Sequence, residues 1–442
     1  MNGLINALEN YQAKMTITNS IFDNNYAVQS GGVLNSRSMR QQTSTLTLTN
    51  NTFTNNKCAQ NGGVYSFILT DYKLNSTNNI YINNSAGLAG GVGFGLRASF
   101  ALLEENAYYE NNVAGTYGGA WYLSANNYKT NLQSFKLSQS TFINSMAQQR
   151  GGCIYVETGS ITIDECTFQN SQAVEYGGDI YVSIGKTVEI TNSSFAASSA
   201  LQGSFVYAEE MDGVLSISSS QISDISSSNS DAFLLTTSAG DFNITDSVIE
   251  NISSPLFLIS DATTLMQNIT LNQISCSKSS NGFCLFKATS TDSLQIINSS
   301  FTEVNSNVDL ISLSSCTDVL FSNISAQNFL KINTQSLLAS EQIYTVNALK
   351  VSSLNVEDSE FIKIGFSGLK VKNSALNLQN SNFSNNLKGG RLLAQSFDDS
   401  IYYALSSQPI QFLVLDTSSS SLTNIIFFQN SLNTLVNGGV TV

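Results

Sequence analysis

The sequence predicts an all-β fold, a single-stranded parallel β-helix (solenoid) of about 15 coils, each coil laying short strands on the coil before it. Three observations support this prediction. Glycine pairs recur in the first half of the chain, an aromatic residue stands nine positions before each pair, and short stretches alternate polar and apolar residues. No stretch repeats its apolar residues with the 3.6-residue period of an amphipathic helix. The repeat is also too short for a propeller blade, and it lacks the leucine and asparagine consensus of leucine-rich repeats.

The glycine pairs and the aromatic residues define one repeating unit of 26 to 33 residues. The pairs begin at Gly31, Gly62, Gly90, Gly118, Gly151 and Gly177, and the aromatic residues are Phe22, Phe53, Tyr81, Tyr109, Phe142 and Phe168. The same frame continues through Phe195 to Gly203 and Ser204. One such unit cannot bury its apolar side chains alone, but units stacked in register bury them continuously.

Short alternating runs carry the unit to the end of the chain. Each run begins seven residues before the aromatic position, as in Met15–Ile17, and the run recurs without glycine pairs at 215–217, 242–244, 294–296, 354–356 and 376–378. We therefore expect a single β-helix domain over residues 1–442, with regular glycine-pair repeats at 12–207 and degenerate repeats at 208–442. Irregular spacing predicts side loops near 331–350 and 390–420, with an extra strand at 408–415.

Each repeated residue type has an expected role in the coil. The aromatic residue, Phe168 for example, should fill the interior and stack on its counterpart one coil away. Asparagine three residues later, as at Asn56, or two residues later, as at Asn144 and Asn170, suits a turn, because its side chain can bond the backbone and it tolerates the left-handed conformation. The glycine pair should supply positive φ and let the next strand begin without a Cβ clash.

Composition and charge exclude several classes of function. The chain has 442 residues, a net charge of −13 and no histidine. Without histidine, Ser-His-Asp hydrolases and His-ligated zinc sites are excluded. The acidic balance and the lack of a basic stripe argue against nucleic-acid binding. No apolar run is long enough for a membrane span, so we expect no direct membrane insertion, and we expect any export signal or anchor to lie outside this chain.

The unit Phe-x-x-Asn followed by Gly-Gly-x-Ile/Leu resembles the paired repeats of the chlamydial polymorphic outer-membrane proteins and similar repeats in ciliate surface proteins. The best matches are Phe53-Thr-Asn-Asn, Gly151-Gly-Cys-Ile and Gly177-Gly-Asp-Ile. The resemblance covers roughly residues 15–207 well and the remainder weakly. It implies a pectin-lyase-like β-helix displayed at the cell surface and associated with adhesion. The right-handed sense expected for the coils comes from this resemblance and from the general rule for parallel crossovers.

A polysaccharide lyase or hydrolase on the same fold is the first alternative, because such enzymes use clustered carboxylates on a solvent-facing stack of strands. The acidic doublets of this chain are Glu104-Glu105, Glu209-Glu210 and Asp398-Asp399. Adjacent residues on a strand face opposite ways, so a doublet is no catalytic pair by itself. We therefore expect the doublets to be solvated surface, Asp179 to point outward in a structural role, and the chain to have no catalytic residue and no cofactor.

Six cysteines show no metal-binding spacing, so no metal site is expected. Cys276 and Cys284 bracket a short turn, and Cys153 and Cys166 bracket another. For an exported protein we predict a disulfide between Cys276 and Cys284; buried free thiols are the alternative.

Ten Asn-x-Ser/Thr sequons are candidate glycosylation sites, although this composition produces about a dozen by chance. Those lying in turns would be the acceptors on a eukaryotic secretory route. The ten are Asn50, Asn75, Asn83, Asn192, Asn243, Asn251, Asn268, Asn298, Asn323 and Asn382.

An aromatic ladder is the candidate binding site. On five successive units an aromatic residue stands three positions after the glycine pair or its equivalent, at Phe94, Tyr122, Tyr155, Tyr181 and Tyr207. Its neighbours on either side are mostly apolar, so strand alternation should turn the aromatic ladder outward, where it could bind sugar rings or a protein. The alternatives are a ladder that only stabilises the fold, or one covered by side loops.

These patterns together predict a non-catalytic structural or adhesive β-helix rod of the cell surface or extracellular space, which contacts glycans or surface proteins. The second alternative is a filament or coat subunit that assembles with itself, end to end or laterally, because an uncapped solenoid offers open strand edges.

Overall fold

The computed structural model describes residues 3–8, 14–37, 44–68, 71–125, 134–227, 234–236, 240–276, 282–306, 308–331, 344–364, 367–372, 374–384, 391–394, 411–416, 419–423 and 426–428. Every regular element in these ranges is a strand, and the strands pair in parallel. The predicted all-β parallel β-helix is therefore confirmed. Among these residues there is also no helix that could cross a membrane.

The chain divides into two compact units, the first formed mainly by residues 1–228 and the second mainly by residues 236–442. The strand β29 (Leu234–Thr236) spans the division. The predictions of a single domain and of right-handed coils stay predictions.

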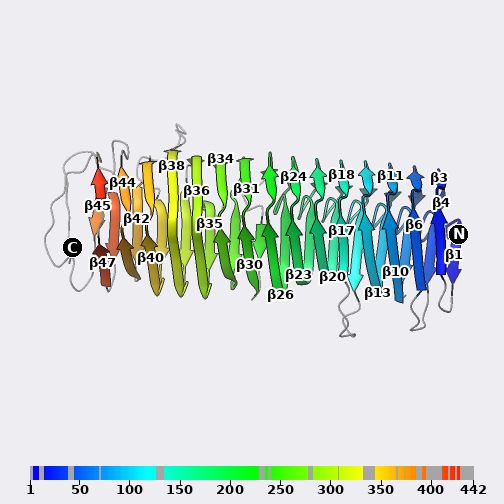
Figure 1. Cartoon of the computed structure of the whole chain (residues 1–442), viewed down its shortest axis with the longest axis horizontal. Coiled ribbons are helices and arrows are strands. Elements are labelled where there is room, and N and C mark those ends of the chain that lie inside the picture. The colour runs from blue at the N-terminus through cyan, green and yellow to red at the C-terminus, as the bar shows by residue number, and fades with distance from the viewer. Residues whose placement is uncertain are drawn as a thin grey trace. The chain divides into compact units, whose positions relative to one another are not determined.

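Each coil of unit 1 has four strand positions, and Figure 1 shows these strands following one another from blue to green. The first position holds β2 (Lys14–Thr18), β6 (Ser44–Thr49), β10 (Asp71–Thr77), β17 (Ser134–Ser138) and the later parts of β13 (Gly93–Glu105), β20 (Ile154–Asp164), β23 (Ile180–Thr191) and β26 (Val206–Ser218). Eight strands therefore stack at this position, each paired with the next.

The second and third positions hold short strands. The second holds β3 (Ile21–Asp23), β7 (Thr52–Thr54), β11 (Ile80–Ile82), β14 (Tyr108–Glu110), β18 (Thr141–Ile143), β21 (Thr167–Gln169), β24 (Ser194–Ala196) and β27 (Gln221–Ser223). The third holds a separate sheet of β4 (Tyr26–Ala27), β8 (Lys57–Cys58), β12 (Ser85–Ala86), β15 (Val113–Ala114), β19 (Met146–Ala147), β22 (Gln172–Ala173), β25 (Ser199–Ala200) and β28 (Ser226–Ser227).

The fourth position follows the glycine pair. It holds β1 (Ile5–Leu8), β5 (Leu34–Arg37), β9 (Tyr65–Ile68), β16 (Trp121–Ala125) and the first parts of β13, β20, β23 and β26. A cover segment precedes each of the five pairs from Gly62 to Gly177, formed by residues 59–61, 87–89, 115–117, 148–150 and 174–176. The last residue of each cover segment bridges to its equivalent on the next coil, as Tyr117 does to Arg150.

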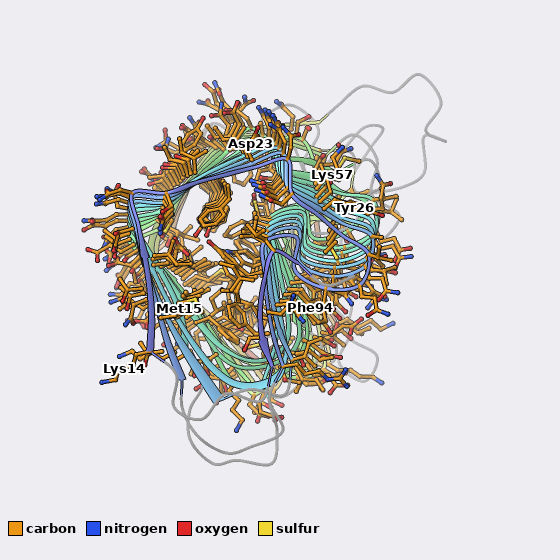
Figure 2. All side chains as sticks on the ribbon, turned by 90° about the vertical axis from the view of Figure 1, so that its right-hand side faces the viewer. Lys14, Met15, Asp23, Tyr26, Lys57 and Phe94 are labelled. Atoms are coloured by element: carbon orange, nitrogen blue, oxygen red, sulfur yellow. A yellow bond between two sulfur atoms is a disulfide. The ribbon has the colours of Figure 1, made fainter. Side chains whose placement is uncertain are left out.

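The interior of unit 1 is built from aligned columns of side chains. Alternation along the strands turns Met15 inward and Lys14 outward (Figure 2). The aromatic position of the repeat forms an interior aromatic column, in which Phe168 is fully buried and its ring centroid lies 4.7 Å from that of Phe142 and 4.6 Å from that of Phe195. This spacing is the coil-to-coil distance of stacked strands, which confirms the predicted stacking.

The turns use asparagine in two ways. The asparagine two positions after the aromatic is the left-handed residue, as predicted for Asn144 and Asn170. The asparagine at plus three is instead buried and forms a ladder between coils: the Oδ1 atom of Asn84 accepts hydrogen bonds from the backbone N–H and the Nδ2 of Asn56, each at 3.0 Å. The predicted bonding of this side chain to the backbone is therefore confirmed, and the left-handed conformation expected at plus three is wrong.

The glycine pair behaves as predicted. The first glycine of each pair has positive φ, as at Gly62 (71°). A Cβ on the second glycine, Gly63, would overlap the carbonyl oxygen of Gly91 on the next coil. Both positions therefore require glycine.

In the part of unit 2 that the structure describes, the coil is simpler and has no short third strand. Its first position holds seven stacked strands: β30 (Asp241–Thr245), β33 (Thr263–Gln267), β40 (Ser353–Glu357), β43 (Ala375–Gln379), β47 (Ser419–Thr423) and the first parts of β36 (Ser293–Ser306) and β38 (Asp318–Lys331). The second holds β31 (Val248–Ile252), β34 (Thr270–Cys276), β41 (Glu360–Ile364), β44 (Asn382–Ser384), β48 (Ile426–Phe428) and the later parts of β36 and β38. The last holds β32 (Phe257–Ser260), β35 (Phe283–Thr289), β37 (Asp309–Ser314), β39 (Tyr344–Leu349), β42 (Ser367–Lys372) and β46 (Gln411–Asp416), with β45 (Arg391–Ala394) paired to β46.

The expected extra strand at 408–415 corresponds to β46. The side loops expected near 331–350 and 390–420 fall largely on residues 332–343 and 395–410, outside the described residues.

Candidate functional site

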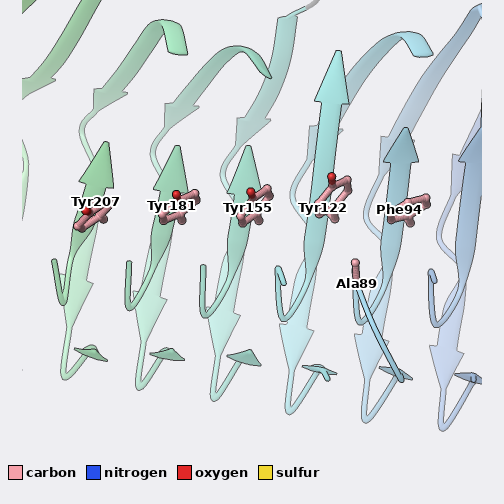
Figure 3. Close-up of a cluster of buried hydrophobic side chains, with 6 residues drawn as sticks. All are labelled: Ala89, Phe94, Tyr122, Tyr155, Tyr181 and Tyr207. Carbon is pink, nitrogen blue, oxygen red and sulfur yellow. The ribbon is translucent and has the colours of Figure 1, made fainter. Parts of the chain in front are cut away.

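The aromatic ladder exists, but the prediction that it forms an exposed platform is wrong. Phe94, Tyr122, Tyr155, Tyr181 and Tyr207 stack on five successive coils with ring centroids 4.8 to 5.4 Å apart (Figure 3). None of the five residues is more than 8% exposed. Buried to this extent, the rings cannot present their faces to a sugar or a protein.

The cover segments are the physical reason. Alternation does turn the aromatic ladder away from the main interior, but each cover segment folds back over it, so that Ala89, Tyr117 and Tyr176 pack against its rings. Tyr117 lies 4.9 Å from Tyr155, and Tyr176 lies 4.7 Å from Tyr207, between ring centroids. The ladder is thus a second core, as in the alternative of a covered ladder. The sequence feature that could have predicted this cover is the tyrosine immediately before two of the glycine pairs, Tyr117 and Tyr176.

The edge of this second core reaches the surface at Arg150. The guanidinium lies over the rings of Tyr176 and Tyr181, 5.2 and 5.1 Å from their centroids, and its Nη1 donates a 2.8 Å hydrogen bond to the hydroxyl oxygen of Tyr181. Glu175 and Glu209 approach the same guanidinium at 3.8 and 3.9 Å. We call these five residues the Arg150 cluster. Sequence reasoning missed it because its members come from three different coils.

The charged side of the Arg150 cluster is partly open to solvent, since the side chains of Arg150, Glu175 and Glu209 are 29%, 41% and 36% exposed. Beside it, the Tyr122 hydroxyl donates a 2.9 Å hydrogen bond to Glu157. Burial is the main reason why the pKa of Tyr155 rises to about 12, so its phenol is neutral at physiological pH. The cluster offers aromatic edges, a cation and carboxylates for binding, and no activated nucleophile.

The expectation that Glu104 is solvated is wrong. Its side chain is fully buried in unit 1, where its Oε1 accepts a 2.7 Å hydrogen bond from Ser76, and Ser76 lies 3.2 Å from the Tyr81 hydroxyl. Burial raises the pKa of Glu104 to about 8, despite hydrogen bonds that favour the ionised form. Glu104 therefore enters the interior as a neutral acid and acts as a polar element of the core.

Glu104 lies in an interior column that is aliphatic apart from Glu104 itself and Ser76. The strand register places Glu104 between Ser76 and Leu137, and Leu48 precedes Ser76. Tyr81 and Tyr109 replace phenylalanine in the interior aromatic column on the same two coils, and Tyr109 accepts a 3.0 Å hydrogen bond from Trp121 Nε1. The polar substitutions are therefore grouped so that they bond to one another.

The expectation that Asp179 points outward is also wrong. It stands directly before β23, in the buried column that follows the glycine pairs, and the backbone N–H of Cys153 on the preceding coil donates a hydrogen bond to its backbone oxygen. Burial raises the pKa of Asp179 to about 7, and the side chains of Ser198 and Ser171 partly offset the rise.

The other acidic residues form no catalytic arrangement in the part of the chain that is described. Glu105 and Glu210 are exposed, and Glu209 pairs with Arg150. Asp398 and Asp399 lie outside the described residues. Among the described residues, no three His, Cys, Asp or Glu side chains gather in a way that could hold a metal.

The predicted disulfide is present, and the other four cysteines are buried free thiols. Cys276 and Cys284 are joined in a disulfide with their Cα atoms 5.6 Å apart. Cys153 and Cys166, which bracket another turn, are buried free thiols, and burial raises their pKa values to about 12 and about 11. Neutral buried thiols of this kind are unreactive.

We expect peptide mapping of native protein under non-reducing conditions to recover Cys276 joined to Cys284. Because the bond closes a loop with a sequence separation of 8, replacing both cysteines by serine should lower the free energy of unfolding by about 2 kcal/mol. Recovery of both residues as alkylated free thiols without reductant would contradict the pairing.

The sequons fall into two structural classes. Seven asparagines are exposed and have positive φ, four of them in turns between strands and three at kinks inside β31, β36 and β38: Asn50, Asn83, Asn192, Asn268, and then Asn251, Asn298 and Asn323. Asn75, Asn243 and Asn382 lie on strands and are half-buried. Glycosylation stays a prediction, with the first class as the sterically accessible acceptors.

Comparison with known proteins adds no relative. No protein-family model matches the chain, and no curated protein matches it in sequence. The stacked parallel coils and the Arg150 cluster are therefore the basis on which a function is proposed.

Proposed function

We propose that the chain is a non-catalytic structural and adhesive β-helix of the cell surface or extracellular space, which contacts glycans or protein partners through the sides of its coils. One observation carries this proposal: among the described residues, the carboxylates and the thiol that the repeat places at interior positions are enclosed. Glu104, Asp179 and Cys153 are each fully buried, so no substrate reaches them.

Two further features support the same proposal. The repeated residues of unit 1 serve stacking between coils, as the interior aromatic column and the glycine pairs do, which suits a scaffold. The disulfide suits an oxidising compartment. The resemblance to β-helical surface proteins supports an adhesive role in particular.

The Arg150 cluster is the contact surface that we assign to this role. The partly exposed ring of Tyr176, beside a cation and carboxylates, can combine contact with a sugar ring with hydrogen bonds to its hydroxyl groups. Protein partners favour the same residue types at the centre of their interfaces.

We expect Arg150→Ala to weaken binding at least tenfold in a glycan array or an assay of adhesion to cells, because it removes the guanidinium that holds Tyr176 and Tyr181 together. The matched control is Lys136→Ala, which removes an exposed cation from a different face of unit 1. Equal binding by the two variants, both folded by circular dichroism, would refute the assignment of the surface.

The same purified protein should release no product from acidic polysaccharides. Lyase or hydrolase activity that is lost on changing Glu209 would overturn the non-catalytic proposal and favour the enzyme alternative.

A further inference from the structure

Two buried columns of unit 1 change their chemistry on the same coils. The turn column holds Asn25, Asn56, Asn84 and Asn112, and then Ser145, Ser171 and Ser198. The column after the glycine pairs holds Val33, Val64, Val92 and Ala120, and then Cys153, Asp179 and Phe205. Asp179, the only carboxylate in the column after the glycine pairs, therefore lies on the coils where serine replaces asparagine in the turn column.

The shorter side chains leave hydrogen-bonding groups unused. The asparagine ladder is saturated: Asn84 Nδ2, for instance, donates to the backbone oxygen of Phe53 at 2.9 Å while its Oδ1 accepts from Asn56. A serine hydroxyl does not reach these partners. The Oγ atoms of Ser145 and Ser198 are buried without a hydrogen-bond partner, and Ser171 Oγ lies 3.1 Å from Cys153 Sγ.

Asp179 adds an uncompensated carboxylate to this layer. It is fully buried, and neither of its carboxylate oxygens has a hydrogen-bond partner. The side chains that act on its pKa are those of Ser198 and Ser171. No ion pair joins it to a lysine or arginine within the described ranges. Buried unpaired polar groups are rare in folded proteins, and each requires an explanation such as a water or an ion.

We propose that Asp179, Ser171 and Ser198 form a buried site for one monovalent cation, sodium or potassium. Carboxylate and hydroxyl oxygens are hard ligands, which suit such ions. A single carboxylate balances one positive charge, whereas a divalent ion would leave a net charge in the interior. The cation gives a partner to the three buried oxygens that lack one, the two carboxylate oxygens of Asp179 and the Oγ atom of Ser198.

The experiment measures thermal unfolding of the full chain in sodium, potassium or tetramethylammonium chloride at equal ionic strength, at pH 8.5 so that protons compete little. We expect sodium or potassium to raise the melting temperature by about 3 °C for each tenfold increase in concentration, and tetramethylammonium to leave it unchanged. Atomic emission after desalting into tetramethylammonium chloride, which replaces the surface counterions of this acidic chain, should find about one sodium or potassium ion per chain.

The variants separate binding from folding. Asp179→Asn should lose both the ion and the salt-specific shift, and Ser198→Ala should need about tenfold more sodium or potassium for the same shift while leaving the carboxylate in place. The matched control, Ser193→Ala, alters a buried serine whose hydroxyl donates to Thr191 on another turn, and it should respond like the unchanged protein.

Two results would overturn the proposal. If neither sodium nor potassium stabilises the unchanged protein beyond tetramethylammonium, and no ion is retained, Asp179 is buried as a neutral acid or beside water. If calcium alone stabilises it, the charge-balance argument is wrong.

Discussion

Replacing Phe168 by serine is expected to lower the free energy of unfolding of unit 1 by about 4 kcal/mol, because it opens a cavity in a fully buried stack and buries a hydroxyl without a partner. The ring lies between Phe142 and Phe195, so both neighbours lose a stacking contact. Chemical denaturation gives the free energy. Hydrogen exchange should show that the loss is concentrated in the adjoining coils, since each coil contacts only its neighbours.

The control is Tyr26→Ser, which removes an aromatic side chain that is 63% exposed and should cost less than about 1 kcal/mol. Equal losses for the two variants would contradict the interior aromatic column, because they would mean that burial does not distinguish the two rings.

Periodicity explains why most of the fold could be predicted. The aromatic position and the glycine pair recur in one frame, and a residue that recurs in one frame of a solenoid occupies the same place on every coil. Phe168 and Gly62 could therefore be assigned an interior stack and a positive φ before any coordinates were known. The cover segments could not, since alternation gives the side of a strand on which a residue lies and not what folds over that side.

The errors on Glu104 and Asp179 have a different origin. Both lie in columns that the repeat frame already marks as interior, five residues before Tyr109 and directly after Gly178. The general rarity of buried carboxylates outweighed the frame. In this chain the frame was the stronger evidence, because stacked coils fix the direction of each side chain whatever its polarity.

Glu104→Gln is expected to stabilise unit 1 by about 3 kcal/mol at pH 7. The folded protein holds Glu104 with a pKa of about 8, whereas the unfolded chain ionises it near its ordinary value of 4.5. Below pH 4.5 the carboxyl is protonated in both states. As pH rises toward 8 the unfolded state loses the proton and the folded state keeps it, so stability falls by about 1.36 kcal/mol for each pH unit.

The measurement is the difference in free energy of unfolding between Glu104→Gln and the unchanged protein from pH 4 to pH 9. Glutamine keeps an acceptor for Ser76 and cannot ionise, so the difference should grow through this window and level off above pH 8. Other titrating groups cancel because they are common to both proteins. Glu105→Gln, on the opposite exposed face of the same strand, is the matched control and should lack the rise. A difference that stays flat from pH 5 to pH 8 would mean that Glu104 is ionised in the folded protein, and would contradict its burial as a neutral acid.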